Sequence, residues 1–216
     1  MTALVRYLLS DVLRTQRFLP PLLLFGAVLG MLYSSDAGPA LGAYSGTCAL
    51  VYPVGVWLTV VIATAEDPVR RSITVVASGG WGRTQSAVTL LAAAGVLGVA
   101  VIATLVPLVT QSRPYPPEVV GQGFAGLLVC GLAGVGVGVL CSRPVVPQPG
   151  WSALAALALV VLGYVLGRVP PVGMVLGALG DGRGDVWGKI ALSGGCAVLL
   201  VVAATLVART LGPRGG

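Results

Sequence analysis

Three long stretches of the sequence carry no charged residue. Residues 41–65, 86–110 and 119–141 contain no Asp, Glu, Lys or Arg. Each is longer than the roughly 20 apolar residues that a helix needs to cross the hydrocarbon core of a bilayer. Only 9% of the chain is charged, against roughly 25% in an average soluble domain. The sequence therefore predicts an all-α, polytopic membrane protein and excludes a water-soluble globular fold.

The apolar pattern predicts six transmembrane helices, preceded by an N-terminal segment of different character. Residues 1–17 place leucines and valines on one half of a helical wheel and Arg6, Arg14 and Arg17 on the other, which is typical of an interfacial helix lying on a membrane. The alternative for this segment is a cytosolic tail. We therefore expect an N-terminal amphipathic interfacial helix (1–17), a transmembrane domain (18–210) and a cytoplasmic tail (211–216). The six predicted spans are 18–33, 41–65, 86–110, 119–141, 151–166 and 186–208.

The basic residues predict the orientation of these spans. Cytoplasmic loops of membrane proteins are enriched in Lys and Arg. With the N-terminus inside, nine of the 13 basic residues fall on the inner side and four on the outer side. We therefore expect a multi-pass protein of the cell membrane with both termini in the cytoplasm. The four outer residues are Arg113, Arg168, Arg183 and Lys189; the nine inner ones are Arg6, Arg14, Arg17, Arg70, Arg71, Arg83, Arg143, Arg209 and Arg214.

The loop after the second span predicts a short cytoplasmic helix. Asp67 is a favourable N-cap and Pro68 a favourable first helical residue, while Gly79-Gly80 is a helix stop. Between these signals, Val69, Ile73 and Val76 share one helix face. The sequence therefore predicts a helix over 68–78, with a simple loop as the alternative.

A second short apolar stretch precedes the sixth span. Residues 170–179 begin with two prolines and are too few to cross a bilayer. A re-entrant or interfacial element is the first interpretation. The alternative is that the fifth span continues after a proline break.

Several function classes are excluded by missing residues. The chain has no histidine, so the commonest metal ligand and the usual general base are absent. It has no P-loop motif for ATP phosphates, and Cys48, Cys130, Cys141 and Cys196 show no CxxC spacing. No carboxylate lies deep in a span, whereas ion-coupled carriers usually have an ionisable residue there. We therefore expect no catalytic residue, no metal, no cofactor and no nucleic-acid partner, and any energy for transport must come from another chain.

One face of the second span could line a substrate pathway. Five residues at helical spacing mix aromatic, small and hydroxyl side chains without charge, which suits a lipophilic or amphipathic solute. The alternative is ordinary helix–helix packing with the hydroxyls bonded to their own helix, and the two interpretations are close. The face consists of Tyr44, Cys48, Tyr52, Gly55 and Thr59.

Glycine pairs four residues apart predict close packing of helices. Gly26/Gly30 and Gly134/Gly138 are examples of such small-xxx-small pairs, which allow two helix backbones to approach. Because the chain contains 32 glycines, some pairs arise by chance. We interpret them as packing contacts, not as binding sites.

The whole pattern resembles the permease subunit of a type-2 ABC exporter. The resemblance covers nearly the whole chain in architecture and is most specific in residues 66–83, where an acidic residue ends the second span and a short helix leads to a basic residue that opens the third. It implies that 68–78 is a coupling helix docking on a separate ABC-type ATPase, present in two copies per complex. It also implies a second permease, identical or homologous, and a hydrophobic or amphipathic substrate. The implied ATPase-coupling residues are Glu66, Val69, Arg70, Arg71, Ile73 and Val76.

Two other classes stay open at this point. A membrane substrate-binding subunit of a vitamin importer also has six spans, but it would have polar, ligand-specific outer loops, and few are present here. A non-catalytic membrane assembly protein is the second. The chain is short for an exporter permease and has no soluble insertion, so the sequence leaves the substrate undetermined.

Overall fold

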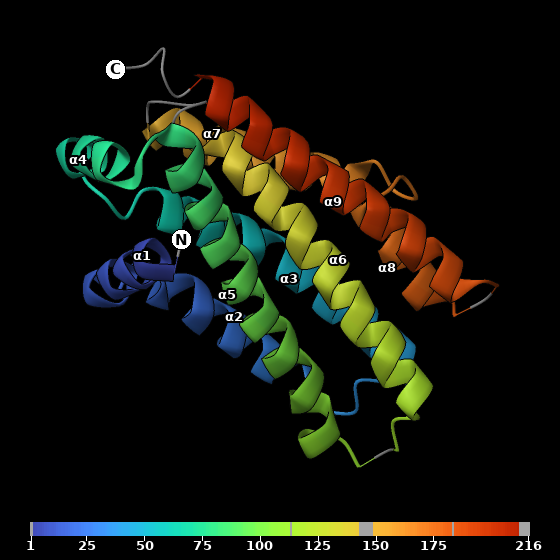
Figure 1. The fold of residues 1–216 in the computed structure, drawn as a ribbon. Coiled ribbons are helices and arrows are strands. Elements are labelled where there is room, and N and C mark those ends of the chain that lie inside the picture. The colour runs from blue at the N-terminus through green and yellow to red at the C-terminus, as the bar shows by residue number, and fades with distance from the viewer. Residues whose placement is uncertain (1, 113, 143–148, 183, 212–216) are drawn as a thin grey trace.

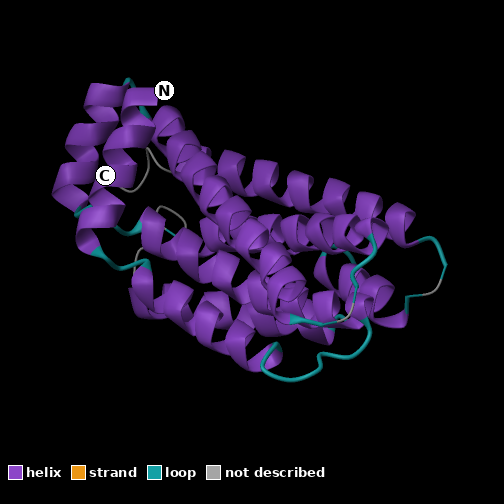
Figure 2. Ribbon diagram, turned by 90° about the horizontal axis from the view of Figure 1, so that it is seen from below, coloured by secondary structure: helices purple, strands orange, loops and turns teal. Residues whose placement is uncertain are grey.

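The computed structural model describes the backbone of residues 2–112, 114–142, 149–182 and 184–211, and their side chains except at positions 2, 3, 68, 69 and 149. Within these ranges every regular element is an α-helix (Figures 1 and 2), which confirms the all-α prediction. The predicted tail, 211–216, lies outside the described residues except for Leu211. The helices are α1 (Thr2–Thr15), α2 (Leu19–Leu32), α3 (Ala40–Ala63), α4 (Pro68–Ser78), α5 (Trp81–Thr110), α6 (Pro117–Cys141), α7 (Pro149–Val165), α8 (Val172–Asp181) and α9 (Val186–Leu211).

Four of the described helices are long and apolar enough to cross a membrane: α3, α5, α6 and α9. The predicted count of six is not confirmed, because α2 has 14 residues and α7 has 17. At a rise of about 1.5 Å per residue, these helices reach only about 21 and 26 Å, short of a hydrocarbon core of about 30 Å. The pair α1–α2 counts as a fifth candidate if its bend of 73° is a break within one span.

The bend between α1 and α2 changes the expected role of the N-terminal helix. Gln16 adopts a positive φ of 53° at the break. On α1, Leu8 and Val12 are buried in a cluster with residues of α3 and α5, while Leu9 and Leu13 are exposed. The apolar half of α1 is therefore divided between the protein core and the surface, whereas an interfacial helix would direct all of it to the membrane.

Helix α6 forms the centre of the bundle, and its glycines let α3 lie directly against it (Figure 1). A Cβ atom at Gly134 would lie 2.5 Å from the carbonyl oxygen of Tyr52, and one at Gly138 would lie 2.6 Å from the Cβ of Thr59. Such distances are shorter than any ordinary contact. The interpretation of Gly134/Gly138 as a packing pair is thus confirmed.

The outer surface of the bundle is apolar. In α9, only 22% of the most apolar window is buried, and leucines and valines of α2, α5, α7 and α9 are exposed. Soluble monomers rarely expose large contiguous apolar patches. Together with the long apolar helices, this surface supports a multi-pass membrane protein.

Helix α8 continues the direction of α7 instead of turning back. The hydroxyl of Tyr52 on α3 donates to the carbonyl of Leu159 on α7. Farther toward the start of α3, Ser45 donates to the carbonyl of Leu176 on α8, and a Cβ at Gly182 would lie 3.6 Å from Leu41. The contacts move steadily along α3, so the re-entrant interpretation of 170–179 is replaced by its alternative, an apolar element that continues after the proline break.

The two ends of the bundle differ. Helices α1 and α4 and the C-terminal end of α9 gather at one end, at the upper left of Figure 1, while the loops after α2 and α5 lie at the opposite end. At that opposite end, the side chain of Gln111 bonds the carbonyls of Tyr33 and Ser35 and the amide of Ala37. This side chain therefore holds the α2–α3 connection in place. The predicted topology assigns the α4 end to the cytoplasm.

Candidate functional site: the α4 helix and its attachment

Helix α4 occupies the range over which the sequence predicts a short helix. Asp67 lies at the N-cap with extended backbone but makes no side-chain capping bond; its carbonyl accepts from the amide of Arg71 at 2.9 Å. At the other end, Gly79 is left-handed with φ of 85°, and the amide of Gly80 reaches back to the carbonyl of Val75 at 2.9 Å. The glycine stop works as predicted, whereas the aspartate caps through its backbone.

The inner face of α4 is attached to two long helices by one buried arginine. Arg71 is only 6% exposed. Its guanidinium donates to the carbonyl of Ala63 at the end of α3 (2.9 Å) and to Oε1 of Gln85 in α5 (3.2 Å). It also lies 5.5 Å from the ring centroid of Trp81, within range of a cation–π interaction. Because hydrogen bonds from a charged group are stronger than neutral ones, Arg71 couples α4 to both neighbours.

Two hydroxyl groups complete this attachment. Thr74 donates to Oε1 of Glu66 at 2.9 Å, which joins α4 to the segment that follows α3. Ser78 and Thr84 share a hydrogen bond at 2.9 Å, which joins the last turn of α4 to the first turn of α5. The polar face of α4 is therefore directed into the protein.

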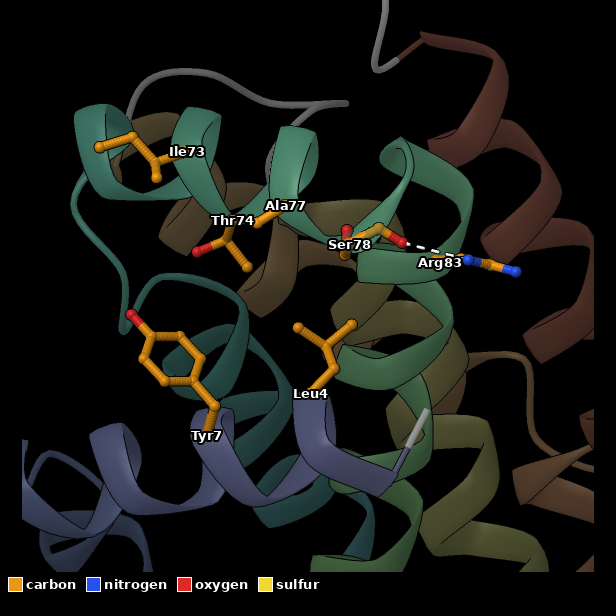
Figure 3. A pocket seen from close by; sticks show the side chains of 7 residues that line it. All are labelled: Leu4, Tyr7, Ile73, Thr74, Ala77, Ser78 and Arg83. Atoms are coloured by element: carbon orange, nitrogen blue, oxygen red, sulfur yellow. Dashed lines mark hydrogen bonds between the residues drawn. The ribbon is translucent and has the colours of Figure 1, made fainter.

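The outer face of α4 carries uncovered apolar side chains beside polar ones. Ile73 is 65% exposed and Val76 is 82% exposed, and Arg70 is exposed beside them. The side chain of Val69 lies outside the described residues. Between α1 and α4 there is a groove of about 630 Å³, shown in Figure 3 with Leu4 and Tyr7 of α1 on its lower side. The groove is lined by Leu4, Tyr7, Ile73, Thr74, Ala77, Ser78 and Arg83.

The structure thus divides the coupling residues that the sequence analysis grouped together. Ile73, Val76 and Arg70 are available to a partner. Arg71 is not, because its guanidinium is buried on the opposite face. Glu66 is half-buried and accepts a hydrogen bond from Thr74. Within this chain, Arg71 therefore attaches α4 to α3 and α5.

The proposed pathway face of α3 is buried inside this chain, against α6 and its neighbours. All five of its residues are buried. The side chains of Cys48 and Tyr44 pack directly against glycines of α6. A Cβ atom added at Gly126 would touch the Cys48 sulfur, and one added at Gly123 would overlap the Tyr44 ring. The hydroxyl of Thr59 bonds the carbonyl of Gly55 in its own helix, as the packing alternative anticipates.

Tyr52 of that face also borders a crevice. It lines a crevice of about 140 Å³ together with apolar residues of α6 and α7 and with Leu200 of α9. A Cβ at Gly163 of α7 would lie 2.8 Å from the Tyr52 hydroxyl oxygen, so this glycine is needed for the close approach. A pathway along the other four residues would require α3 and α6 to separate.

Gln85 and Trp81 are the residues that sequence reasoning missed. Gln85 is 1% exposed, and its Nε2 has no hydrogen-bond partner among the described residues. The sequence feature that could have identified Gln85 is its amide side chain, which directly precedes the apolar run 86–110. A buried amide needs a partner, and the Oε1 of Gln85 has one in the Arg71 guanidinium of α4.

The described residues contain no group of three or more Cys, Asp or Glu side chains that could hold a metal ion. No family model, no curated protein and no solved structure matches this chain. Any function must therefore be argued from the geometry above.

Proposed function

We propose that this chain is the transmembrane permease subunit of an ATP-driven exporter and that α4 is the element on which a separate ATPase docks. The supporting observation is the reversed orientation of α4. An amphipathic helix at a protein surface normally buries its apolar face. Helix α4 instead buries Arg71 and Thr74 together with Val75, and it exposes Ile73 and Val76. An apolar face left exposed at the end of a protein indicates a missing partner.

The attachment of α4 gives this docking a mechanical consequence. Force applied to Ile73 and Val76 acts on a helix that Arg71 ties to the end of α3 and the start of α5. These two helices belong to the four that are long enough to span a membrane. Movement of α4 is therefore transmitted directly into the transmembrane bundle.

The remaining parts of the proposal concern assembly and substrate. We infer two ATPase copies and a second permease, identical or homologous, from the resemblance to type-2 ABC exporter permeases. Six crossings are proposed, with the short α2 and the α7–α8 pair completing the four long spans. The substrate is hydrophobic or amphipathic, and Tyr52 in its crevice is the position where such a molecule first meets the Tyr44–Thr59 face.

The docking proposal is tested by placing a charge on the exposed face of α4. The Ile73→Asp variant should lose the co-purifying ATPase, because truncating or charging an apolar anchor at an interface costs about 2 kcal/mol or more at a hot spot. The measurement is quantitative mass spectrometry of proteins retained with the tagged chain in mild detergent. The wild-type chain should retain a P-loop ATPase in equal amount, and the purified chain alone should hydrolyse no ATP.

Two matched variants separate docking from folding. Ile73→Leu keeps the apolar surface and should retain the ATPase. Leu13→Asp places the same charge on an exposed apolar position of α1, 53% exposed, and should also retain it. If Ile73→Asp inserts normally and still retains the ATPase with full transport, α4 is not the docking element.

A further inference from the structure

A charged pocket lies at the end of the bundle opposite α4. Its volume is about 490 Å³. It is formed by the connection that follows α7, by one side of α8 and by the first turn of α9. The lining residues are Arg168, Met174, Gly177, Ala178, Asp181 and Lys189.

The fold brings two basic residues from separate elements into this pocket. Both belong to the small set of four that the predicted topology assigns to the outer side. Arg168 lies 3.4 Å from a carboxylate oxygen of Asp181, and their side chains are 86% and 55% exposed. No acceptor in the described part of the chain lies within hydrogen-bonding distance of the Lys189 ammonium. Two cations face one carboxylate, so the pocket carries a net positive charge.

The pairing of Arg168 with Asp181 leaves the arginine free to change partners. Exposed ion pairs contribute little, typically about 0–1 kcal/mol. A planar guanidinium binds the oxygens of a phosphate in a bidentate manner better than it binds a single carboxylate oxygen. An incoming phosphate could therefore take Arg168 from Asp181 at small cost and engage Lys189 as well.

The surroundings of the pocket match those expected where a protein meets a membrane surface. Two residues before Lys189, Trp187 is 47% exposed, and its ring packs against Gly121 of α6; tryptophan is enriched where membranes meet water. From Ile190 onward α9 has no charged residue before Arg209. Met174 and Ala178 of α8 provide an apolar floor. A molecule with a phosphate above a hydrocarbon portion matches this arrangement.

We propose that this pocket binds a phosphate-bearing anion and that the anion is the headgroup of an anionic phospholipid. Arg168 and Lys189 hold the phosphate, Asp181 competes with it for Arg168, and the glycerol region rests on Met174 and Ala178. The site is independent of the proposed ATPase docking, because it lies at the other end of the molecule and uses none of the same residues.

The test is photo-crosslinking with a phosphatidylglycerol that carries a diazirine next to its headgroup. Purified protein in non-ionic detergent is crosslinked at a subsaturating lipid concentration, and mass spectrometry of chymotryptic peptides locates the label. We expect label in residues 172–189. Because each basic residue near a membrane surface contributes about one kcal/mol to binding an anionic lipid, Lys189→Gln should lower this yield roughly fivefold.

A second variant, which should raise the crosslinking yield instead of lowering it, makes the test specific. Asp181→Asn removes the competing carboxylate and should raise the yield in 172–189. The arginines of α1 lie at the other end of the molecule, so crosslinking of the lipid to α1 provides an internal reference. Neither variant should change the yield of label at α1. Arg14→Gln should lower label at α1 only.

Competition distinguishes the source of the phosphate. Unlabelled phosphatidylglycerol should displace the probe from 172–189, whereas phosphatidylcholine and inorganic phosphate at equal concentration should not. If inorganic phosphate competes as well as the lipid does, the phosphate site stands and the lipid assignment is overturned. If Lys189→Gln and Asp181→Asn leave the yield in 172–189 unchanged, or if phosphatidylcholine competes equally, the proposal is wrong.

Discussion

The contact between α3 and α6 predicts opposite effects for two substitutions of the same kind. Gly134→Ala and Gly30→Ala each add one methyl group to a helical glycine. A Cβ at Gly134 would lie 2.5 Å from the carbonyl oxygen of Tyr52 and 3.0 Å from the amide nitrogen of Val56. A Cβ at Gly30 would have nothing within 4 Å. Both variants gain helix propensity, because alanine replaces glycine in a helix. They differ only in the packing of the added methyl group.

The size of the effect follows from these distances. Both atoms that oppose Gly134 belong to the backbone of α3, so no side chain can rotate away and the two helices must move apart by about 1 Å. Overpacking of this kind costs about 1–3 kcal/mol, and replacing glycine by alanine in a helix returns up to about 1 kcal/mol. We expect Gly134→Ala to lower the free energy of unfolding by about 1–2 kcal/mol and Gly30→Ala to leave it unchanged or raise it slightly.

Both variants can be measured by titration from mild detergent into SDS, followed by tryptophan fluorescence. The difference between the two free energies isolates the packing cost, because the propensity gain is common to both. Equal stability of the two variants, or a Gly134→Ala protein more stable than the wild type, would refute the α3–α6 geometry and with it the burial of the Tyr44–Thr59 face.

Two further variants test other contacts. Arg71→Met keeps the length of the side chain but leaves the carbonyl of Ala63 and the amide of Gln85 without their donor, at a cost of about 1–3 kcal/mol for each; amide hydrogen exchange over 79–86 should become faster, and unchanged exchange would show that Arg71 does not hold α4. Gln111→Ala removes all three bonds to the α2–α3 connection and should increase proteolysis at 34–38, with unaltered cleavage as the contrary result.

The elements with strong local signals were predicted well from the sequence. The 68–78 helix has a proline at its start and two glycines at its end, and these signals act within a few residues. The long uncharged runs likewise predicted α3, α5 and α6, because burial in lipid demands a continuous apolar length. The limits of these helices depend on local chemistry and little on the rest of the fold.

Features that depend on tertiary packing could not be predicted in the same way. The direction of α8 follows from its contacts with Ser45 and Leu41 on α3, and no local pattern encodes these contacts. The predicted number of six spans is not confirmed for a related reason, since α2 and α7 are apolar but short. Whether such a helix crosses a membrane depends on the element that follows it.

Arg70 and Arg71 show how neighbouring identical residues acquire different roles. Helical periodicity places them about 100° apart, so only one of the two can face the ends of α3 and α5. Arg71 finds Gln85 and Trp81 there and is buried, while Arg70 stays exposed. The sequence contains both arginines but not the identity of the buried partners, which come from the next helix.

Helices α1 and α4 lie at the same end of the molecule with opposite polarity, and this contrast defines what a partner must offer. Helix α1 buries Leu8 and Val12 and exposes arginines, whereas α4 buries Arg71 and exposes Ile73 and Val76. The groove of about 630 Å³ runs between them. A partner seated there would meet apolar side chains on both walls, including Leu4 on α1 and Ile73 on α4, and the basic side chain of Arg83 from α5. The proposed ATPase should therefore present an apolar socket bordered by acidic residues, with the apolar contact supplying affinity and the charges supplying a salt-dependent rate of association.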